Sequence, residues 1–309
     1  MGRRGELTKI ILVTGFLGSG KTSLLNGFIR GLKDKKLGIM VNDFGAVAVD
    51  DEILKNDNPA LGGNGQSIIK IENGSIFCSC RRSALYDALE YYRKIRPDYL
   101  LIETSGISDP SAINDIMAEK RSADCFELVS VVCLADASTF LKTCKLFNFI
   151  RKQIINADLV LLNKTDLVGK EDIDLEKKLV REWNDRAEIV ETVYSRISPD
   201  IFKPRKKTRR DLPEEDIPGR DKPLSYTVWP VNIGPLKLER VLDEVKEKIF
   251  RVKGFLSHGN TAYLVNGAAG NIAIEKANRK PEKYSLSFIF DKYYEADVKR
   301  AIHKINGPV

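Results

Sequence analysis

The stretch GFLGSGKT, residues 15–22, follows an apolar run, Ile10–Val13, and precedes a segment with helical periodicity. Glycine loses more backbone entropy on folding than other residues, so Gly15, Gly18 and Gly20 need a geometric reason to stand so close together. A turn from a strand into a helix, curled so that successive backbone N–H groups point inward, provides that reason. The stretch therefore predicts a phosphate-binding loop in an α/β protein.

The polar side chains of this loop have predicted tasks. The Lys21 ammonium is expected to reach the β- and γ-phosphates of a nucleotide, and the Thr22 hydroxyl to coordinate Mg²⁺. A helix that begins near Lys21 adds the positive end of its dipole. The predicted nucleotide-binding residues of the loop are Gly18, Ser19, Gly20, Lys21, Thr22 and Ser23.

Short apolar runs alternate with helical stretches from Thr8 to Ser195. Their apolar residues are nearly continuous, which is typical of strands buried on both faces of a parallel sheet. The predicted strands cover residues 9–15, 36–43, 98–105, 127–136, 157–164 and 188–195. The pattern predicts a doubly wound, mostly parallel α/β sheet in a domain that spans residues 1–195.

The rest of the chain differs in composition. Residues 196–223 hold five of the chain's 12 prolines and the basic run KPRKKTRR, so they cannot bury enough apolar surface to offset their ordering entropy. We expect a charged, mobile linker there and a second, smaller α+β domain over residues 224–309. The predicted helices of that domain are 236–250 and 294–305, and its predicted strands are 225–233, 252–256, 261–266, 271–276 and 284–290.

Charge and hydropathy exclude several classes of partner. The net charge is +7, but no aromatic residues interleave with the basic run at 203–210, which favours a solvated linker over a nucleic-acid partner. No apolar run is long enough to span a bilayer, and Met1–Lys9 is too short and polar for a secretory signal. The five cysteines are odd in number and unevenly spaced, so we expect a cytoplasmic protein without a disulfide framework.

A second motif predicts which base is bound. NKTD, Asn163–Asp166, follows the strand-like run ADLVLL, at the edge where a parallel sheet presents its ligands. An aspartate there can accept hydrogen bonds from N1–H and the N2 amino group of guanine, which adenine does not offer. Each such bond contributes roughly 1.5 to 3 kcal/mol, so the pair predicts a preference for guanine of about a hundredfold or more. We expect Asn163, Lys164 and Asp166 to form the base-binding part of the site.

Two further motifs predict the chemistry at the γ-phosphate. ETSG, residues 103–106, places Glu103 where it can hold Mg²⁺ or orient the attacking water, and Gly106 where the backbone can approach the phosphate. VNDFG, residues 41–45, places Asp43 either at the metal or in an ordinary turn. The predicted catalytic residues are therefore Lys21, Glu103 and Asp43, with Thr22 and Glu103 as Mg²⁺ ligands.

Taken in order, GFLGSGKT, VNDFG, NGSIFCSC, ETSGISDP and NKTD resemble the CobW-type P-loop GTPases, the CobW/HypB/UreG family of metallochaperone-like proteins. The similarity covers residues 8–195, and RVKGFL at 251–256 resembles that family's small C-terminal domain. The resemblance implies slow, Mg²⁺-dependent GTP hydrolysis. It also implies that the nucleotide state, GTP or GDP, is coupled to delivery of a metal or metallo-cofactor to a client enzyme.

The chain departs from this family at its metal motif, Cys-x-Cys-Cys after Asn-Gly. Here Asn73 and Gly74 are followed by SIFCSC, so only Cys78 matches and Cys80 is an additional thiol. Two thiolates fill half of a tetrahedral zinc shell and need further ligands from elsewhere. Cys78 and Cys80 therefore predict a soft-metal site for zinc or another transition metal, a redox-sensitive pair, or a loop without a ligand.

Three functions stay open at this point. The first is a GTPase metallochaperone that acts on a client metalloenzyme, and the second is a GTPase accessory protein for a corrinoid (cobalamin) protein without a metal of its own. The third is a P-loop small-molecule kinase, against which NKTD argues because guanine selectivity is unusual in such kinases. A homodimer is compatible with each of them.

Overall fold

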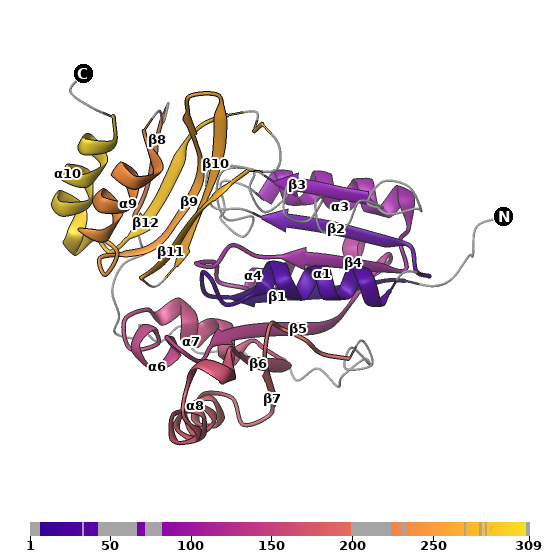
Figure 1. Cartoon of the computed structure of the whole chain (residues 1–309). Helices are drawn as coiled ribbons and strands as arrows, with labels where there is room; N and C mark the ends of the chain where they lie inside the picture. Colours follow the sequence, from indigo (N-terminus) through magenta and orange to yellow (C-terminus); the bar gives the residue numbers. More distant parts are fainter. Residues whose placement is uncertain are drawn as a thin grey trace. The chain divides into compact units, whose positions relative to one another are not determined.

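The computed structural model describes residues 7–32, 34–42, 67–71, 82–198, 224–229, 233–268, 270–277, 280–281 and 283–306. These residues form two compact units, one within 7–198 and one within 224–306 (Figure 1). The predicted linker, residues 196–223, lies largely outside the described residues, so its boundaries stay a prediction.

The first unit is built on a seven-stranded sheet in the order β3-β2-β4-β1-β5-β6-β7 (Figure 1). Every neighbouring pair in it is parallel. Its strands are β1 Thr8–Gly15, β2 Leu37–Asn42, β3 Ser67–Ile71, β4 Tyr99–Glu103, β5 Phe126–Asp136, β6 Leu159–Asn163 and β7 Glu188–Thr192. The predicted parallel α/β sheet is confirmed, and β3 is an edge strand that the apolar runs did not predict.

Helices cover both faces of this sheet, because successive residues of a buried strand point to opposite sides. Ile11 and Val13 of β1 pack in one cluster with α1, whereas Ile10 and Leu12 pack in another cluster with α3 and α4. The unit is therefore doubly wound, as predicted. Its helices are α1 Lys21–Gly31, α3 Arg82–Ile95, α4 Ala112–Ala118, α5 Lys120–Ala123, α6 Phe140–Thr143, α7 Asn148–Ile155 and α8 Lys170–Trp183, with the 3₁₀ turn η2 Thr165–Leu167.

The second unit is an antiparallel sheet in the order β11-β10-β9-β12-β8. The helices α9 and α10 lie on the same face of it (Figure 1), and the core cluster of this unit lies between the helices and the sheet. The predicted smaller α+β domain is confirmed as a fold. Its elements are β8 Leu224–Val228, α9 Pro235–Asp243, β9 Ile249–His258, β10 Thr261–Ala268, β11 Asn271–Lys276, β12 Leu286–Phe290, the 3₁₀ turn η4 Lys292–Tyr294 and α10 Glu295–Asn306.

The predicted helix over residues 236–250 is wrong at its carboxyl end. The helix α9 ends at Asp243, and Ile249 and Phe250 already belong to β9. Ile249 pairs with Phe290 of β12, so cross-strand pairing in the sheet decides the conformation of residues that continue a helical pattern in the sequence.

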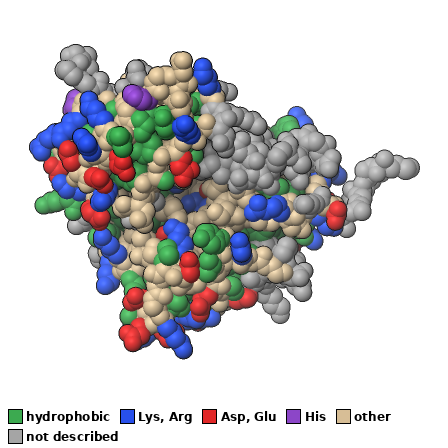
Figure 2. All heavy atoms as spheres, in the orientation of Figure 1, with side chains coloured by type: hydrophobic (Ala, Val, Ile, Leu, Met, Phe, Trp, Pro, Cys, Tyr) green, Lys and Arg blue, Asp and Glu red, His purple; other side chains and the backbone are tan. Residues whose placement is uncertain are grey.

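On the side drawn in Figure 2, acidic and basic side chains are interspersed. Among the helices that the structure describes, none combines the length and apolar character needed to cross a bilayer.

Candidate nucleotide-binding site

The loop between β1 and α1 begins at Gly15 and ends where α1 starts, at Lys21. Gly15, Gly18 and Gly20 have φ angles of 136°, 77° and 105°, in the region that only glycine adopts without strain. A Cβ atom on Gly15 would lie 2.3 Å from the carbonyl oxygen of Leu134 in β5. The glycines are therefore required by the backbone path of the loop.

The cation of this loop is held close to the loop's own backbone. The buried Lys21 ammonium donates hydrogen bonds to the carbonyl oxygens of Gly15, at 2.9 Å, and Phe16, at 3.1 Å. The hydroxyl of Ser19 is buried and makes no hydrogen bond within the described part of the chain. A cation, an unused hydroxyl and the amino end of the 11-residue helix α1 together fit a bound phosphate.

Asn163, the first residue of NKTD, ties the end of β6 to the phosphate loop. Its amide nitrogen donates to the carbonyl oxygen of Ser19, at 2.8 Å, and to the hydroxyl of Ser195, at 3.0 Å. Its amide oxygen accepts from the backbone N–H of Ser195, at 2.9 Å. We call these three hydrogen bonds the Asn163 clamp, because the buried side chain joins three loops at one edge of the sheet.

Ser195 forms the other half of this junction. Its hydroxyl donates to the carbonyl oxygen of Gly20, at 3.0 Å, and the chain reaches it through left-handed backbone at Tyr194 and Ser195, with φ angles of 55° and 54°. A Cβ atom on Gly20 would lie 2.4 Å from the amide nitrogen of Asn163 and 2.5 Å from the Ser195 hydroxyl oxygen. Sequence analysis missed Ser195 as a site residue because the predicted strand 188–195 includes it, whereas β7 ends at Thr192 and Ser195 lies in the loop that follows, at the same sheet edge as the other loops.

The two charged residues of NKTD have different surroundings. Lys164 adopts a left-handed conformation, with φ of 64°, and its ammonium bonds to a carboxylate oxygen of Asp136 at 2.6 Å. Asp136 also accepts from the backbone and the hydroxyl of Ser138, so it is fixed in place. Asp166 lies exposed in η2, and its carboxylate makes no hydrogen bond within the described residues. That carboxylate is therefore available to a ligand.

The ETSG turn lies against the phosphate loop. Glu103 is the buried last residue of β4 and is in register with Val13 of β1. A Cβ atom on Gly106 would lie 2.8 Å from the backbone nitrogen of Leu17 and 2.6 Å from its Cδ2 atom. The hydroxyl of Thr22 and the carboxylate of Glu103 are oxygen ligands of the kind that Mg²⁺ prefers.

Comparison with known proteins shows which family the first unit resembles. A family model of the CobW/HypB/UreG nucleotide-binding domain matches residues 9–191. The chain belongs to the CobW/HypB/UreG family. Proteins of this family are P-loop GTPases.

Several relatives of known name share this family's sequence pattern. The chain is 30% identical to the zinc chaperone YjiA of Escherichia coli over 270 residues, which cover 80% of this chain and 81% of YjiA. It is 28% identical to the zinc-regulated GTPase metalloprotein activator 1 of Dictyostelium discoideum over 221 residues, 62% of this chain but only 46% of that relative. The crystal structure of Zn(II)-bound YjiA aligns over 97% of this chain and 99% of YjiA, with 22% identity and a TM-score of 0.51, which shows the shared fold.

A cavity adjoins the Asn163 clamp in this family member. Its volume is about 470 Å³, and it lies between α1 and residues 194–197. The polar residues that line it include Ser23, Asn26 and Arg30 of α1 together with Ser195 and Arg196. Ser23, a predicted binding residue, therefore faces a space with a polar lining next to the phosphate loop.

Of the residues predicted to bind a metal in this CobW/HypB/UreG chain, Thr22 and Glu103 are described by the structure, and three others lie outside the described part. Asp43, Cys78 and Cys80 all lie there. Within the described ranges, no three His, Cys, Asp or Glu residues lie together in a way that could hold a metal ion.

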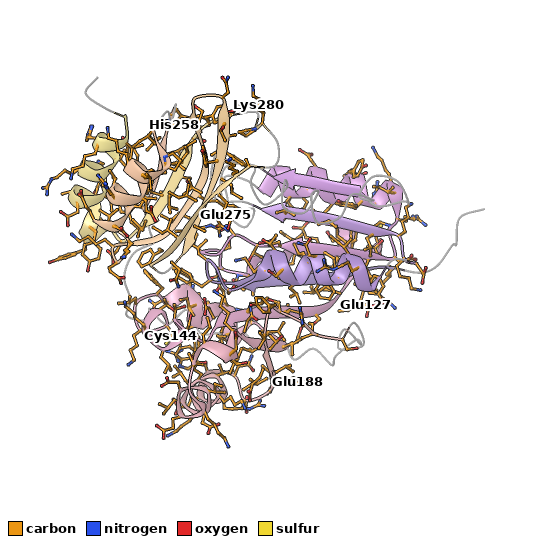
Figure 3. The ribbon with its side chains drawn as sticks, in the orientation of Figure 1. Glu127, Cys144, Glu188, His258, Glu275 and Lys280 are labelled. Carbon is orange, nitrogen blue, oxygen red and sulfur yellow. The ribbon has the colours of Figure 1, made fainter. Side chains whose placement is uncertain are left out.

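Two of the described cysteines, Cys133 and Cys144, are buried. Burial raises the pKa of the Cys133 thiol to about 12, although the Lys21 charge opposes this. Burial also raises the pKa of Cys144, which lies beside α6 (Figure 3). Both thiols are therefore harder to ionise than an exposed cysteine, and as small buried side chains they pack in the interior of the first unit.

Proposed function

We propose that this member of the CobW/HypB/UreG family binds GTP and hydrolyses it with Mg²⁺, and that its nucleotide state controls delivery of zinc to a client metalloprotein. The observation that carries the proposal is the Asn163 clamp. It holds the NKTD motif against the phosphate loop, so one ligand can contact both the triphosphate site and Asp166. A P-loop kinase has no need of a guanine-reading carboxylate at this place.

In this proposal, each side chain of the site has a role. The loop amides and Lys21 hold the β- and γ-phosphates, and Asp166 accepts hydrogen bonds from N1–H and the N2 amino group of guanine. Thr22 and Glu103 would supply oxygen ligands for Mg²⁺, and the ion would neutralise phosphate charge that develops during hydrolysis. Glu103 also orients the attacking water, because it stands in register with the strand that leads into the loop.

We expect intrinsic hydrolysis to be slow, as the resemblance to metallochaperone-like GTPases implies. A carrier that hydrolysed GTP before it met its client would release its cargo in the wrong place. Contact with the client is therefore the step that we expect to accelerate hydrolysis.

The proposed cargo rests on the named relatives and on two thiols. YjiA is named a zinc chaperone, and Cys78 and Cys80 offer two soft ligands. A half-filled tetrahedral shell suits a transferable ion, because the client can supply the remaining ligands and then replace the first two. Mg²⁺ prefers oxygen ligands, so the two ions do not compete for the same groups.

Calorimetric titration of the whole chain with GTP and with ATP, each with Mg²⁺, tests the nucleotide part of the proposal. We expect GTP to bind about a hundredfold more tightly than ATP. Lys21→Ala should abolish binding of GTP, while Lys142→Ala, a change at an exposed lysine of α6, should leave it unchanged. Equal affinity for the two nucleotides would overturn the assignment as a GTPase.

Metal analysis of the purified chain tests the cargo separately. We expect stoichiometric zinc that is lost in Cys78→Ser and retained in Cys125→Ser, a matched change at a half-buried thiol. Zinc affinity should also differ between the GTP and GDP states. A chain that binds GTP but no metal would refute zinc delivery and favour an accessory role without a metal of its own.

A further inference from the structure

A buried glutamine of α7 holds the backbone of the ETSG turn. The side chain of Gln153 is fully buried, and its amide nitrogen donates to the carbonyl oxygens of Gly106, at 3.3 Å, and Ser108, at 3.0 Å. One carboxamide therefore holds two backbone carbonyl groups of the turn, two residues apart. No motif in the sequence points to this residue.

The turn that Gln153 holds is packed directly on the phosphate loop. The backbone N–H of Thr104 donates to the carbonyl oxygen of Val13, at 2.9 Å, and the hydroxyl of Thr104 donates to that of Thr14, at 3.1 Å. There is no room for a Cβ atom on Gly106 beside Leu17. A displacement of Gly106 would therefore also displace the loop that is expected to hold the γ-phosphate.

The helix α7 also contacts the phosphate loop itself. The ring of Phe16 stands 5.8 Å from the ring of Phe147 and 5.8 Å from that of Phe149, at the start of α7. At the far side of the turn, Lys152 of α7 forms an ion pair with Asp109 at 3.1 Å. The helix thus supports the phosphate loop at one end and the ETSG turn along its length.

The carboxamide of Gln153 is only partly used. Its oxygen is buried and accepts no hydrogen bond from the described residues. An unused buried acceptor costs free energy, which an apolar side chain of similar length would avoid. This cost is recovered if the ETSG turn changes conformation and one of its backbone N–H groups then donates to the Gln153 oxygen.

We propose that Gln153 is a positioning residue for GTP hydrolysis, which holds the Gly106 backbone at the γ-phosphate end of the site and lets α7 move with that turn. The inference rests on the proposed function. Gln153 acts through the ETSG backbone and does not contact the base-reading Asp166, so it affects hydrolysis and leaves nucleotide affinity in place.

The test uses Gln153→Met, which keeps the length of the side chain and removes both donors. We expect the kcat for GTP hydrolysis to fall roughly tenfold or more, while GDP affinity stays within about threefold of wild type. The matched control is Asn184→Leu. Asn184 is a buried amide that donates to the carbonyl oxygens of Ile154 and Ala157, at 2.8 Å each, and so holds the carboxyl end of α7 without touching the turn.

Four outcomes decide the inference. A lower kcat in Gln153→Met than in an equally destabilised Asn184→Leu protein supports it. Unchanged hydrolysis in Gln153→Met, or an equal loss in both variants, overturns it. A wild-type chain that binds no guanine nucleotide overturns the proposed function and this inference together.

Hydrogen exchange on the wild-type chain keeps the inference testable if Gln153→Met does not fold. We expect residues 105–108 and residues 150–155 to change their exchange together between GDP and a non-hydrolysable GTP analogue. A change confined to residues 105–108, with α7 unaffected, would show that the helix does not follow the turn and would overturn the inference.

Discussion

The Asn163 clamp offers the most direct test by mutation, because the structure defines each hydrogen bond that would be lost. Asn163→Ala deletes the amide that joins the carbonyl oxygen of Ser19 to the backbone and hydroxyl of Ser195, at distances of 2.8 to 3.0 Å. The phosphate loop and NKTD then lose their direct connection. We expect both the stability of the first unit and its affinity for guanine nucleotides to fall.

The size of the effect follows from the three bonds. Each contributes about 1 kcal/mol net, and a buried partner left without a replacement costs about 1 to 3 kcal/mol. The free energy of unfolding should therefore fall by about 3 kcal/mol or more. If a similar free energy is needed to bring the loops together around the ligand, the dissociation constant for GDP rises about a hundredfold.

Urea unfolding and calorimetric titration with GDP measure the two effects on the same protein. Asn156→Ala is the matched control, because the Asn156 amide donates, among the described residues, only to the carbonyl oxygen of Lys152, at 2.8 Å, and Asn156 lies just after the carboxyl end of α7. It should leave GDP affinity unchanged. An Asn163→Ala protein that is folded and binds GDP within about threefold of wild type would refute the reasoning.

Three further predictions concern the first unit. Burial raises the pKa of Glu176 to about 8 from 4.5, so the stability it contributes is complete below pH 4.5 and is lost as pH rises through about 8. Glu176→Gln should remove this decline in the free energy of unfolding, which is about 1.4 kcal/mol per pH unit between those values. Urea unfolding at pH 6 and pH 9 measures the decline, and an equal decline in both proteins would contradict the prediction. Tyr92→Phe should lower the free energy of unfolding by about 1 to 3 kcal/mol, because the buried phenol bonds both the N–H and the carbonyl of Ile39; no loss in a thermal melt would be the opposing result. Gly106→Ala should slow GTP hydrolysis, because its Cβ atom would displace Leu17, and unimpaired turnover in a phosphate-release assay would count against the proposed role of the turn.

The sequence predicted the fold where physical constraints are local. Continuous apolar runs and glycines with left-handed backbone specify the parallel strands and the loop between β1 and α1 without reference to the rest of the chain. The edge strand β3, Ser67–Ile71, was missed because Lys70 interrupts its apolar run and its conformation depends on pairing with β2. The end of α9 was missed for the same reason, since β9 pairs with β10 and β12.

The residues that position the site were the hardest to predict. Asp166 and Lys21 belong to motifs, NKTD and GFLGSGKT, that can be recognised in the sequence itself. Ser195 and Gln153 instead form hydrogen bonds with residues far away in the sequence, Gly20 and Gly106. Serine and glutamine are common residues, so only the folded arrangement distinguishes these two from the others.

The central claim is that Asp166 reads the base of a nucleotide whose phosphates lie in the loop at residues 15–22. The most direct measurement compares the affinities of wild type and Asp166→Asn for GTP and for xanthosine triphosphate, which carries a carbonyl where guanine has its amino group. The account predicts that wild type prefers GTP and that Asp166→Asn, whose amide can donate to that carbonyl, prefers the xanthine nucleotide. An unchanged order of preference in Asp166→Asn, in a folded protein, would contradict it.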